Sequence, residues 1–420
     1  MASPTSVREL RYRVGTTLNT THIAPSTVAT WDATNSTKLR ITSIDLSGLV
    51  YEGADDPTLE SQVYRGRPKV PTLRKGSIKF SMWGEGAESD LTANPVATLL
   101  SKLAGGLASP ASTRTATAIT AGSDADTIAS TGVGAKVQVG QAVLCGVRGD
   151  GDGEAEVRII SAEATNSINV AMNLQAAMIT DAVAVISTTV FPDPTATQSY
   201  LDFVAIGLSA EDQMQTVGGM GTFTVEGLNP GELPKIGFEI NVADWQEVAS
   251  GSRATLAPST APSGDAPAAT RGLGGFFLGD ASSATRTVFK VADVTFNPGL
   301  TYEAVPGMNG VNGIEGWQQV PSNPTLECTV LLEGNADPLP GFYDDYVAGT
   351  AKQLIVQCGS TATKCMAIDM PYCVFDSAPA RTSVGNLQGV KVVLRGLTQD
   401  LTSSTTAQYL AKAAWRLHTF

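Results

Sequence analysis

The chain has 420 residues, of which 28 are basic and 40 are acidic, so its formal net charge is −12. This length exceeds that of one ordinary domain and predicts two or three folded units. Proteins that grip nucleic acid draw their affinity from clustered Lys and Arg, so the acidic balance argues against such a role. The N-terminal segment MASPTSVRELRYRVG lacks the apolar core of a signal peptide, and no apolar run of about 18 residues follows. We therefore expect a soluble protein.

Glycine and proline are frequent, at 42 and 22 residues, while aromatic residues make up 6%. Stretches rich in Ala, Ser, Thr and Val are short and broken by turn residues, which favours a mainly β fold with short helices. The cysteines are odd in number and form no CxxC pair, which predicts reduced, buried side chains rather than disulfides or zinc ligands. They are Cys145, Cys328, Cys358, Cys365 and Cys373.

In chain order, residues 1–36 are rich in Ser, Thr and Ala without a clear period, which predicts an extended N-terminal arm that a partner must order. Folded structure is expected to begin near Leu39. A first strand follows over 41–46, and a second has Ile78, Phe80 and Met82 on one face. The segment NPVATLLSKLAGG, residues 94–106, carries the capping residues and apolar spacing of a short amphipathic helix.

Residues 223–242 predict a hairpin, because two alternating segments flank a Leu-Asn-Pro-Gly turn. After residue 285 a similar order recurs: two strands separated by a long segment, a short helix beginning at a proline, and two further strands. Ile44 and Phe80 are 36 positions apart, and so are Val294 and Val330. Equal order with near-equal spacing predicts a duplicated unit.

The first unit is interrupted by residues 111–196, whose three compact strands predict a small inserted SH3-like β-barrel on the outer surface. The domain layout is therefore an N-terminal arm at 1–36, a discontinuous first unit at 37–110 and 197–249, the insert at 111–196, a linker or crossing arm at 250–284, a second unit at 285–402, and a C-terminal arm or short helix at 403–420. The long segments Tyr51–Gly76 and Gly299–Asn323 exceed simple hairpin loops, so we expect them to bridge to a neighbouring layer of an assembly.

The sequence offers few residues for catalysis. Its two histidines, His22 and His418, lie near the ends of the sequence, which argues against a histidine-based triad. The glycine-rich residues 272–280 lack the spacing of a dinucleotide-binding turn. Asp150, Asp152 and Glu154 alternate and could hold a hard cation, although an Asp-Gly hairpin turn explains them without an ion. We expect no enzyme, no cofactor and no metal.

Three segments in this order resemble the tail tube proteins of long, non-contractile (siphovirus) phages. They are KGSIKFSMWGEG followed by NPVATLLSKLAGG, then GGMGTFTVEGLNPGELPKIGFEINV, and finally the stretch from GIEGWQQVPSNPTLECTVLLEG to GVKVVLRGL. The resemblance implies a two-layer, barrel-forming β unit with a flanking helix. Because this chain carries two such units, it resembles the fused branch of the family, in which three subunits form a pseudo-sixfold ring around a lumen.

In such a ring, alternate residues of the inner sheet would face the lumen. The predicted lumen-facing residues are Lys79, Ser81, Thr224, Glu226, Glu239, Asn241, Glu327, Lys391 and Arg395. These side chains mix charge signs, and a weakly retaining wall suits the passage of DNA, which tight phosphate contacts would stall.

The resemblance also implies partners and a location. The partners would be other copies of the chain in helically stacked homotrimers, the tape measure protein, the tail terminator, and baseplate or distal tail proteins, with transient non-specific passage of phage DNA and no membrane. The location would be the virion tail, after assembly in the host cytoplasm. Two alternatives remain open: a baseplate-hub or capsid decoration protein of related β fold, and a glycan-binding tail component.

Overall fold

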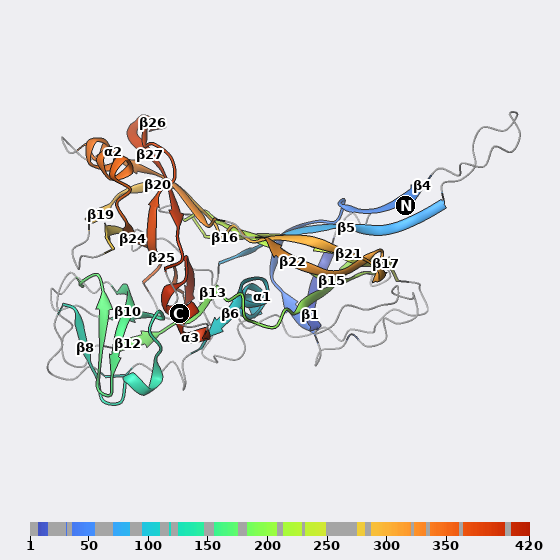
Figure 1. Ribbon diagram of the computed structural model, residues 1–420, viewed down its shortest axis with the longest axis horizontal. Coiled ribbons are helices and arrows are strands. Elements are labelled where there is room, and N and C mark those ends of the chain that lie inside the picture. Colours follow the sequence, from blue (N-terminus) through green and yellow to red (C-terminus); the bar gives the residue numbers. More distant parts are fainter. Residues whose placement is uncertain are drawn as a thin grey trace, which may run out of the picture.

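The computed structural model describes most of the chain, and the described residues fall mainly in antiparallel β-strands (Figure 1). The described residues are 7–15, 31, 36–54, 70–84, 95–109, 117–118, 125–146, 155–174, 183–207, 213–228, 232–248, 275–281, 287–320, 323–332, 337–360, 364–399 and 405–420. The described α-helices are α1 (Pro95–Ala104), α2 (Leu339–Ala348) and α3 (Thr406–Lys412). The predicted mainly β fold with short flanking helices is confirmed.

A first set of strands surrounds α1. It consists of β1 (Val7–Gly15), β2 (Thr37–Leu39), β3 (Ile41–Asp45), β4 (Leu49–Ala54), β5 (Val70–Trp83), β14 (Tyr200–Gly207), β15 (Gln213–Glu226), β16 (Lys235–Val242) and β17 (Asp244–Glu247). β1 pairs with β2 and β14, and β15 pairs with β14, β16 and β17. β5 pairs with β3, β4 and β16. The predicted 223–242 hairpin is confirmed as β15 and β16.

A second set of strands includes α2, which lies between β23 and β24 in the chain. It consists of β18 (Gly275–Asp280), β19 (Thr287–Phe289), β20 (Val291–Asn297), β21 (Thr301–Val311), β22 (Ile314–Val320), β23 (Thr325–Leu331), β24 (Lys352–Cys358), β25 (Met366–Phe375), β26 (Ala380–Val384), β27 (Leu387–Gly396) and β28 (Arg416–Thr419). β18 pairs with β19 and β24, while β25 pairs with β24, β27 and β28. β23 pairs with β20 and β27, and β26 pairs with β27.

The pairings of the first set recur in the second set in the same chain order. β1 and β18 each pair with the next strand along the chain, β2 and β19. Each also pairs with a strand after the helix: β18 with β24, which follows α2 directly, and β1 with β14, which follows α1 only after β6, the insert and β13. Between β3 and the part of β5 that pairs with it lies the ribbon formed by β4 and the first half of β5. In the same place of the second set, the β21–β22 hairpin lies between β20 and β23. The two sets meet where β15 pairs with β20, so they form one continuous sheet.

The insert forms a separate six-stranded sheet in the order β7, β12, β9, β10, β11, β8. Its strands are β7 (Thr117–Ala118), β8 (Thr127–Ala129), β9 (Ala142–Cys145), β10 (Glu156–Ala164), β11 (Ser167–Ala171) and β12 (Val183–Ile186). The insert leaves the main sheet through β6 (Gly105–Ala108) and re-enters through β13 (Thr188–Pro192), and these two strands pair with each other. Among the described residues no pairing joins β7 to β8, so the SH3-like barrel stays a prediction.

One face of the insert is buried against the second set (Figure 1). Leu144 and Ile159 share a core cluster with Phe277 and Ile355 of β18 and β24. The Val157 N–H donates to the side-chain oxygen of Gln357 at 2.8 Å, and the Gln357 amide nitrogen donates to the Ala155 carbonyl. The insert is therefore packed against the main sheet as well as tethered to it.

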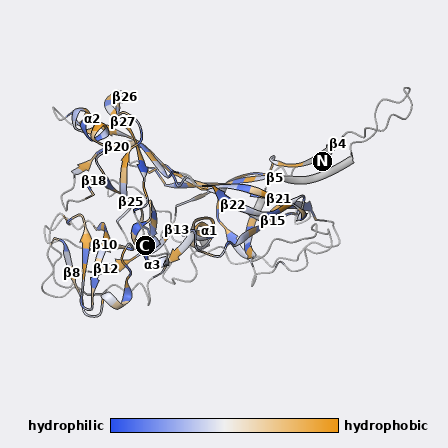
Figure 2. Ribbon diagram, in the orientation of Figure 1, coloured by the Kyte–Doolittle hydropathy of each residue, from blue (hydrophilic) through white to orange (hydrophobic). Residues whose placement is uncertain are grey.

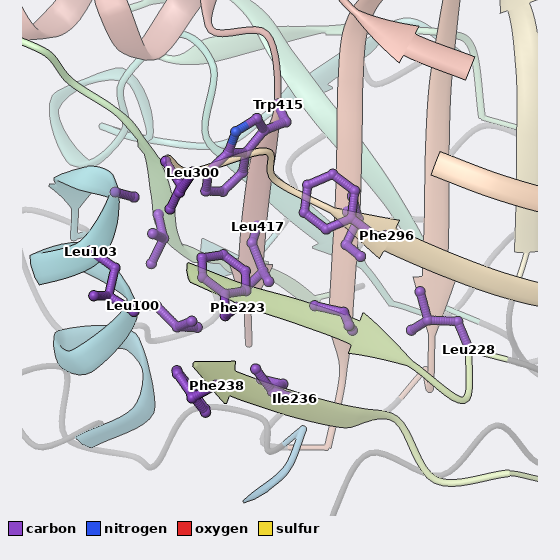
Figure 3. Packing of buried hydrophobic residues seen from close by; sticks show 14 of the residues in the cluster. Leu100, Leu103, Phe223, Leu228, Ile236, Phe238, Phe296, Leu300, Trp415 and Leu417 are labelled. Carbon is purple, nitrogen blue, oxygen red and sulfur yellow. The ribbon is translucent and has the colours of Figure 1, made fainter. Parts of the chain in front are cut away.

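The main core lies on one face of the joined sheets, because apolar and polar residues alternate along the strands (Figure 2). The rings of Phe80 and Phe238 stack with centroids 4.7 Å apart, and Phe223 and Phe296 each meet the edge of Trp415. Figure 3 shows Phe223, Phe238, Phe296 and Trp415 together with Leu100 and Leu103 of α1. Residues from both sets and from β28 thus share one core.

The prediction that folded structure begins near Leu39 was wrong. β1 lies within the expected arm, yet it pairs with β14 and β2 of the same chain. Leu10 and Tyr12 are buried, and burial raises the pKa of Tyr12. Trp31 is also buried, under the guanidinium of Arg13. The contacts that hold β1 and Trp31 are therefore supplied by the chain itself.

The expected linker at 250–284 and the expected C-terminal arm or short helix at 403–420 also contain sheet strands, and the short helix is present as α3. β18 lies within the first segment and pairs along its length with β24. β28 lies within the second and pairs with both β25 and β13. Both are corrections to the predicted layout, because short strands that find partners far along the chain resemble linkers in sequence.

The two equal spacings of 36 positions do not correspond in the structure. Ile44 lies opposite Phe80 in the β3–β5 ladder. In the second set Phe296 lies opposite Leu326, and Val330 lies opposite Val291 rather than Val294. The repeated pairing order thus rests on topology and not on that spacing.

The described parts of the two long segments expected to bridge between layers are paired ribbons. β4 pairs with the first half of β5, and this ribbon projects from one end of the molecule (Figure 1). The β21–β22 hairpin packs on the first set of its own chain: Trp317 donates through its indole N–H to the Gly218 carbonyl at 2.8 Å, and the Asn312 amide donates to the Ala243 carbonyl at 2.7 Å. These contacts lie within one chain, so the bridging of Gly299–Asn323 to another layer stays a prediction.

Candidate functional site: the polar face of the joined sheets

The sheet face opposite the core carries most of the residues predicted to be functional. Along β5, Ile78, Phe80 and Met82 are buried, whereas Lys79 points to the other face and is exposed. Successive strand residues point to opposite faces, so the apolar alternation that forms the core also creates the polar face.

In the first set, an ion pair crosses from β5 to β16. Lys79 lies directly opposite Glu239, and its ammonium nitrogen is 2.8 Å from a Glu239 carboxylate oxygen. The hydrogen bond and charge of Glu239 raise the pKa of Lys79. Asp45 of β3 lies opposite Lys79 on its other side, and hydrogen bonds from Ser47 lower the pKa of Asp45. Three charges of alternating sign therefore run across three neighbouring strands.

The other predicted residues of the first set differ in exposure. Glu226 is exposed at the end of β15, while Thr224 and Asn241 are half-buried. Ser81 is buried, because its hydroxyl contacts the Thr42 hydroxyl at 2.8 Å and the Ser43 hydroxyl of β3. Ser81 therefore fastens β3 to β5 and adds little exposed surface to this face of the isolated subunit. Its position at a lumen stays a prediction.

The second set repeats the arrangement with other residues. Glu327 of β23 and Lys391 of β27 are exposed and form an ion pair at 2.5 Å, diagonally across the ladder. Arg395 of β27 is half-buried and lies 3.3 Å from the carboxylate of Asp376.

The polar residues of the two sets share one face. Val225 of β15 lies opposite Phe296 of β20, and both belong to the core. Their neighbours in sequence, Glu226 and Thr295, therefore point to the opposite side and are exposed. The face thus continues across the junction without a break.

This face is suited to weak rather than tight contact with a polyanion. Lys79, Lys391 and Arg395 each have a carboxylate partner within 3.3 Å. A cation already paired with a carboxylate gains little from a phosphate, and little counterion release then favours binding. The pairs are exposed, so each contributes little to folding stability.

A hollow of about 370 Å³ lies on this face over β3, β5, β15 and β16. Its lining includes the Lys79–Glu239 pair and also Glu226 and Lys235, which lie opposite each other. Among the described residues no group of three His, Cys, Asp or Glu side chains could hold a metal ion. The candidate cation ligands Asp150, Asp152 and Glu154 lie outside the described residues.

Sequence reasoning missed several residues of the face. Asp45, Lys235, Thr295 and Asp376 belong to it, and the first three could have been found from strand alternation with the core residues Ile44, Ile236 and Phe296. Asp376 lies just past the end of β25, where alternation gives no signal.

The remaining candidate groups are buried. All five cysteines are free and buried, as predicted, and burial raises the pKa of Cys358 to about 12. His418 is buried between β13 and β25. Of the tryptophans, Trp31, Trp245, Trp317 and Trp415 are buried, so they are not available for stacking on a sugar.

No protein-family model matches the chain, and no curated protein matches it either. In the part of the chain that the structure describes, no helix has the length and apolar character needed to cross a membrane.

Proposed function

We propose that the chain is the subunit of a siphovirus-type tail tube, a structural virion protein without a catalytic role. One observation carries the proposal: two sets of strands with the same pairing order are joined edge to edge through β15 and β20 into one sheet with one polar face. This arrangement supports two like units per chain, each contributing one segment of a larger barrel.

The outer edges of the joined sheet support further pairing. Among the described residues, β3 pairs only with β5, and β26 pairs only with β27. An unpaired edge invites another strand, and closing the sheet into a ring removes every edge. We propose that β3 of one copy continues the sheet beside the β25–β26 edge of the next, as β20 continues it beside β15 within the chain.

In this proposal three copies close a pseudo-sixfold ring, and rings stack through heterologous contacts into a hollow filament. The core face packs outward against the second layer, and the polar face lines the lumen. Its paired charges would allow phage DNA to pass without being held. The partners would be the tape measure protein, the tail terminator and baseplate or distal tail proteins, within the virion tail.

Electron micrographs of the purified, concentrated protein test the proposal. We expect long hollow filaments made of rings with threefold symmetry. Single rings that do not stack would favour the alternative, a baseplate-hub protein of related fold. A protein that stays monomeric at every concentration tried would refute the tube proposal.

A further inference from the structure

An apolar stripe lies exposed on α2. Tyr343 and Val347, one helical turn apart, are 51% and 68% exposed, and Pro340 continues the stripe. The ring of Tyr346 lies beside that of Tyr343, with centroids 6.4 Å apart. Of the residues of α2 only Phe342 is buried, against Phe289 and Phe375. Contiguous exposed apolar surface of this kind marks a contact site.

The helix in the matching position of the first set, α1, has no such exposure. Both helices stop at a glycine with positive φ, Gly105 and Gly349. Counting back from these glycines, Leu99 and Leu103 of α1 match Tyr343 and Val347 of α2. Leu99 and Leu103 are both fully buried.

Part of the cover of α1 comes from the second set. The Tyr302 hydroxyl donates to the carbonyl of Leu103, and Leu300 is buried in the same core cluster as that residue (Figure 3). Leu300 and Tyr302 follow directly after β20, which reaches α1 because it pairs with β15. The segment after β20 therefore covers the helix of the preceding set.

We propose that the exposed stripe of α2 binds the segment Leu46–Val50 of a second copy of this chain. This inference rests on the proposed ring, in which β3 of the next copy lies beside β25 and β26. Leu46–Val50 follows β3 just as Leu300 and Tyr302 follow β20, and the side chain of Val50 is 46% exposed. The contact continues between copies the interface that already exists within the chain.

The placement of the two surfaces agrees with a repeating contact. α2 lies toward one end of the long axis of the molecule, and the β4–β5 ribbon that begins at Leu49 lies at the other end (Figure 1). Two surfaces on opposite sides of a subunit can join head to tail and close a ring. A symmetric contact, in which the stripe and the Leu46–Val50 segment of one copy both meet their counterparts on a single other copy, would instead need the two surfaces on the same side of the subunit.

Disulfide cross-linking between copies tests the contact. Val50→Cys and Val347→Cys are made in separate full-length chains, mixed and oxidised, so that a disulfide can form only between copies. The native cysteines are all buried and do not compete. A matched control mixes Val50→Cys with Leu107→Cys, since Leu107 is also exposed but lies on β6.

We expect a cross-linked dimer at least about tenfold more abundant from the test mixture than from the control. In a second variant, Tyr343→Asp with Val347→Asp, the concentration needed for assembly should rise at least about tenfold, because charge would be buried at the contact. Rings that form while both readouts match the control would overturn this contact and leave the tube proposal standing. Absence of any ring from the unchanged protein would overturn both.

Discussion

Val225 of β15 lies directly opposite Phe296 of β20, and this pair joins the two sets of strands. Both side chains are fully buried in the common core, and the ring of Phe296 also meets Trp415. The junction is thus held by apolar packing on one side and leaves its polar side open.

Truncating Phe296 should destabilise the whole subunit. We expect Phe296→Ala to lower the free energy of unfolding by about 3–5 kcal/mol, because it leaves a cavity in a well-packed core. Urea denaturation measures the change. The neighbouring substitution Thr295→Ala, on the exposed face, should change stability by less than about 0.5 kcal/mol. Equal effects of the two variants would contradict the assigned faces.

If the polar face lines a lumen, a cysteine placed on it should react in filaments with small reagents but not with large ones. A cysteine placed by Thr295→Cys should react in the free subunit with both a small maleimide and a large polymer-linked maleimide. In filaments the large reagent should be excluded, because the wall surrounds the residue. Glu163→Cys on β10 of the insert, also exposed, is the control and should react with both reagents in both states. Full reaction of Thr295→Cys with the large reagent in filaments would place this face outside.

Removing the insert should impair folding. Deletion of 111–186 with a short linker keeps β13 and would expose Phe277 and Ile355, which the insert now covers. Each large apolar side chain left uncovered costs about 1.5–3 kcal/mol, so the deletion variant should melt earlier and aggregate. Adding Phe277→Ser and Ile355→Thr to the deletion should restore solubility. A deletion variant as stable as the full chain would show that the insert packs only loosely.

Burial of His418 predicts a loss of stability in mild acid. The ring is fully buried and its Nδ1 lies 2.9 Å from the Thr189 hydroxyl, while its Nε2 has no hydrogen-bond partner among the described residues. Burial, with the nearby charge of Arg416, holds the pKa of His418 well below its usual value. The unfolded chain therefore takes up a proton near pH 6.5 that the folded chain refuses, so stability falls as the pH drops below that value.

His418→Gln should remove this dependence between about pH 7 and pH 5. Asp369 and Asp202 have pKa values raised by burial and act in the opposite direction, but the variant and the unchanged protein share them. The difference between the two unfolding curves across pH therefore reports His418 alone. Parallel curves would refute the assignment.

The sequence predicted elements whose signals are local. Alternation along β5, β15 and β16 predicted both the core and the polar face. A proline at the start and a glycine at the end predicted the bounds of α1 and α2. The sequence did not reveal β1, because its three arginines resemble a solvated arm. The structure buries Arg11 beside Glu9 and lays Arg13 over Trp31. β18 and β28 were missed because their partners lie far along the chain.

The sequence predicted which residues lie on the polar face, but not which of them form ion pairs with each other. Lys79 and Glu239 were both assigned to one face, yet the register that sets them opposite each other depends on strands from distant parts of the chain. The burial of Ser81 was not predictable, since strand alternation does not show that β3 would cover it.

The pairing of β13 with β28 can form only late in the synthesis of the chain. Thr189 and His418, which meet in this ladder, are 229 positions apart in the chain. A ribosome must therefore complete nearly the whole second set before β13 gains this neighbour, and contacts so distant in sequence form slowly. Partly synthesised chains would lack the β13–β28 pairing that links the insert to the second set.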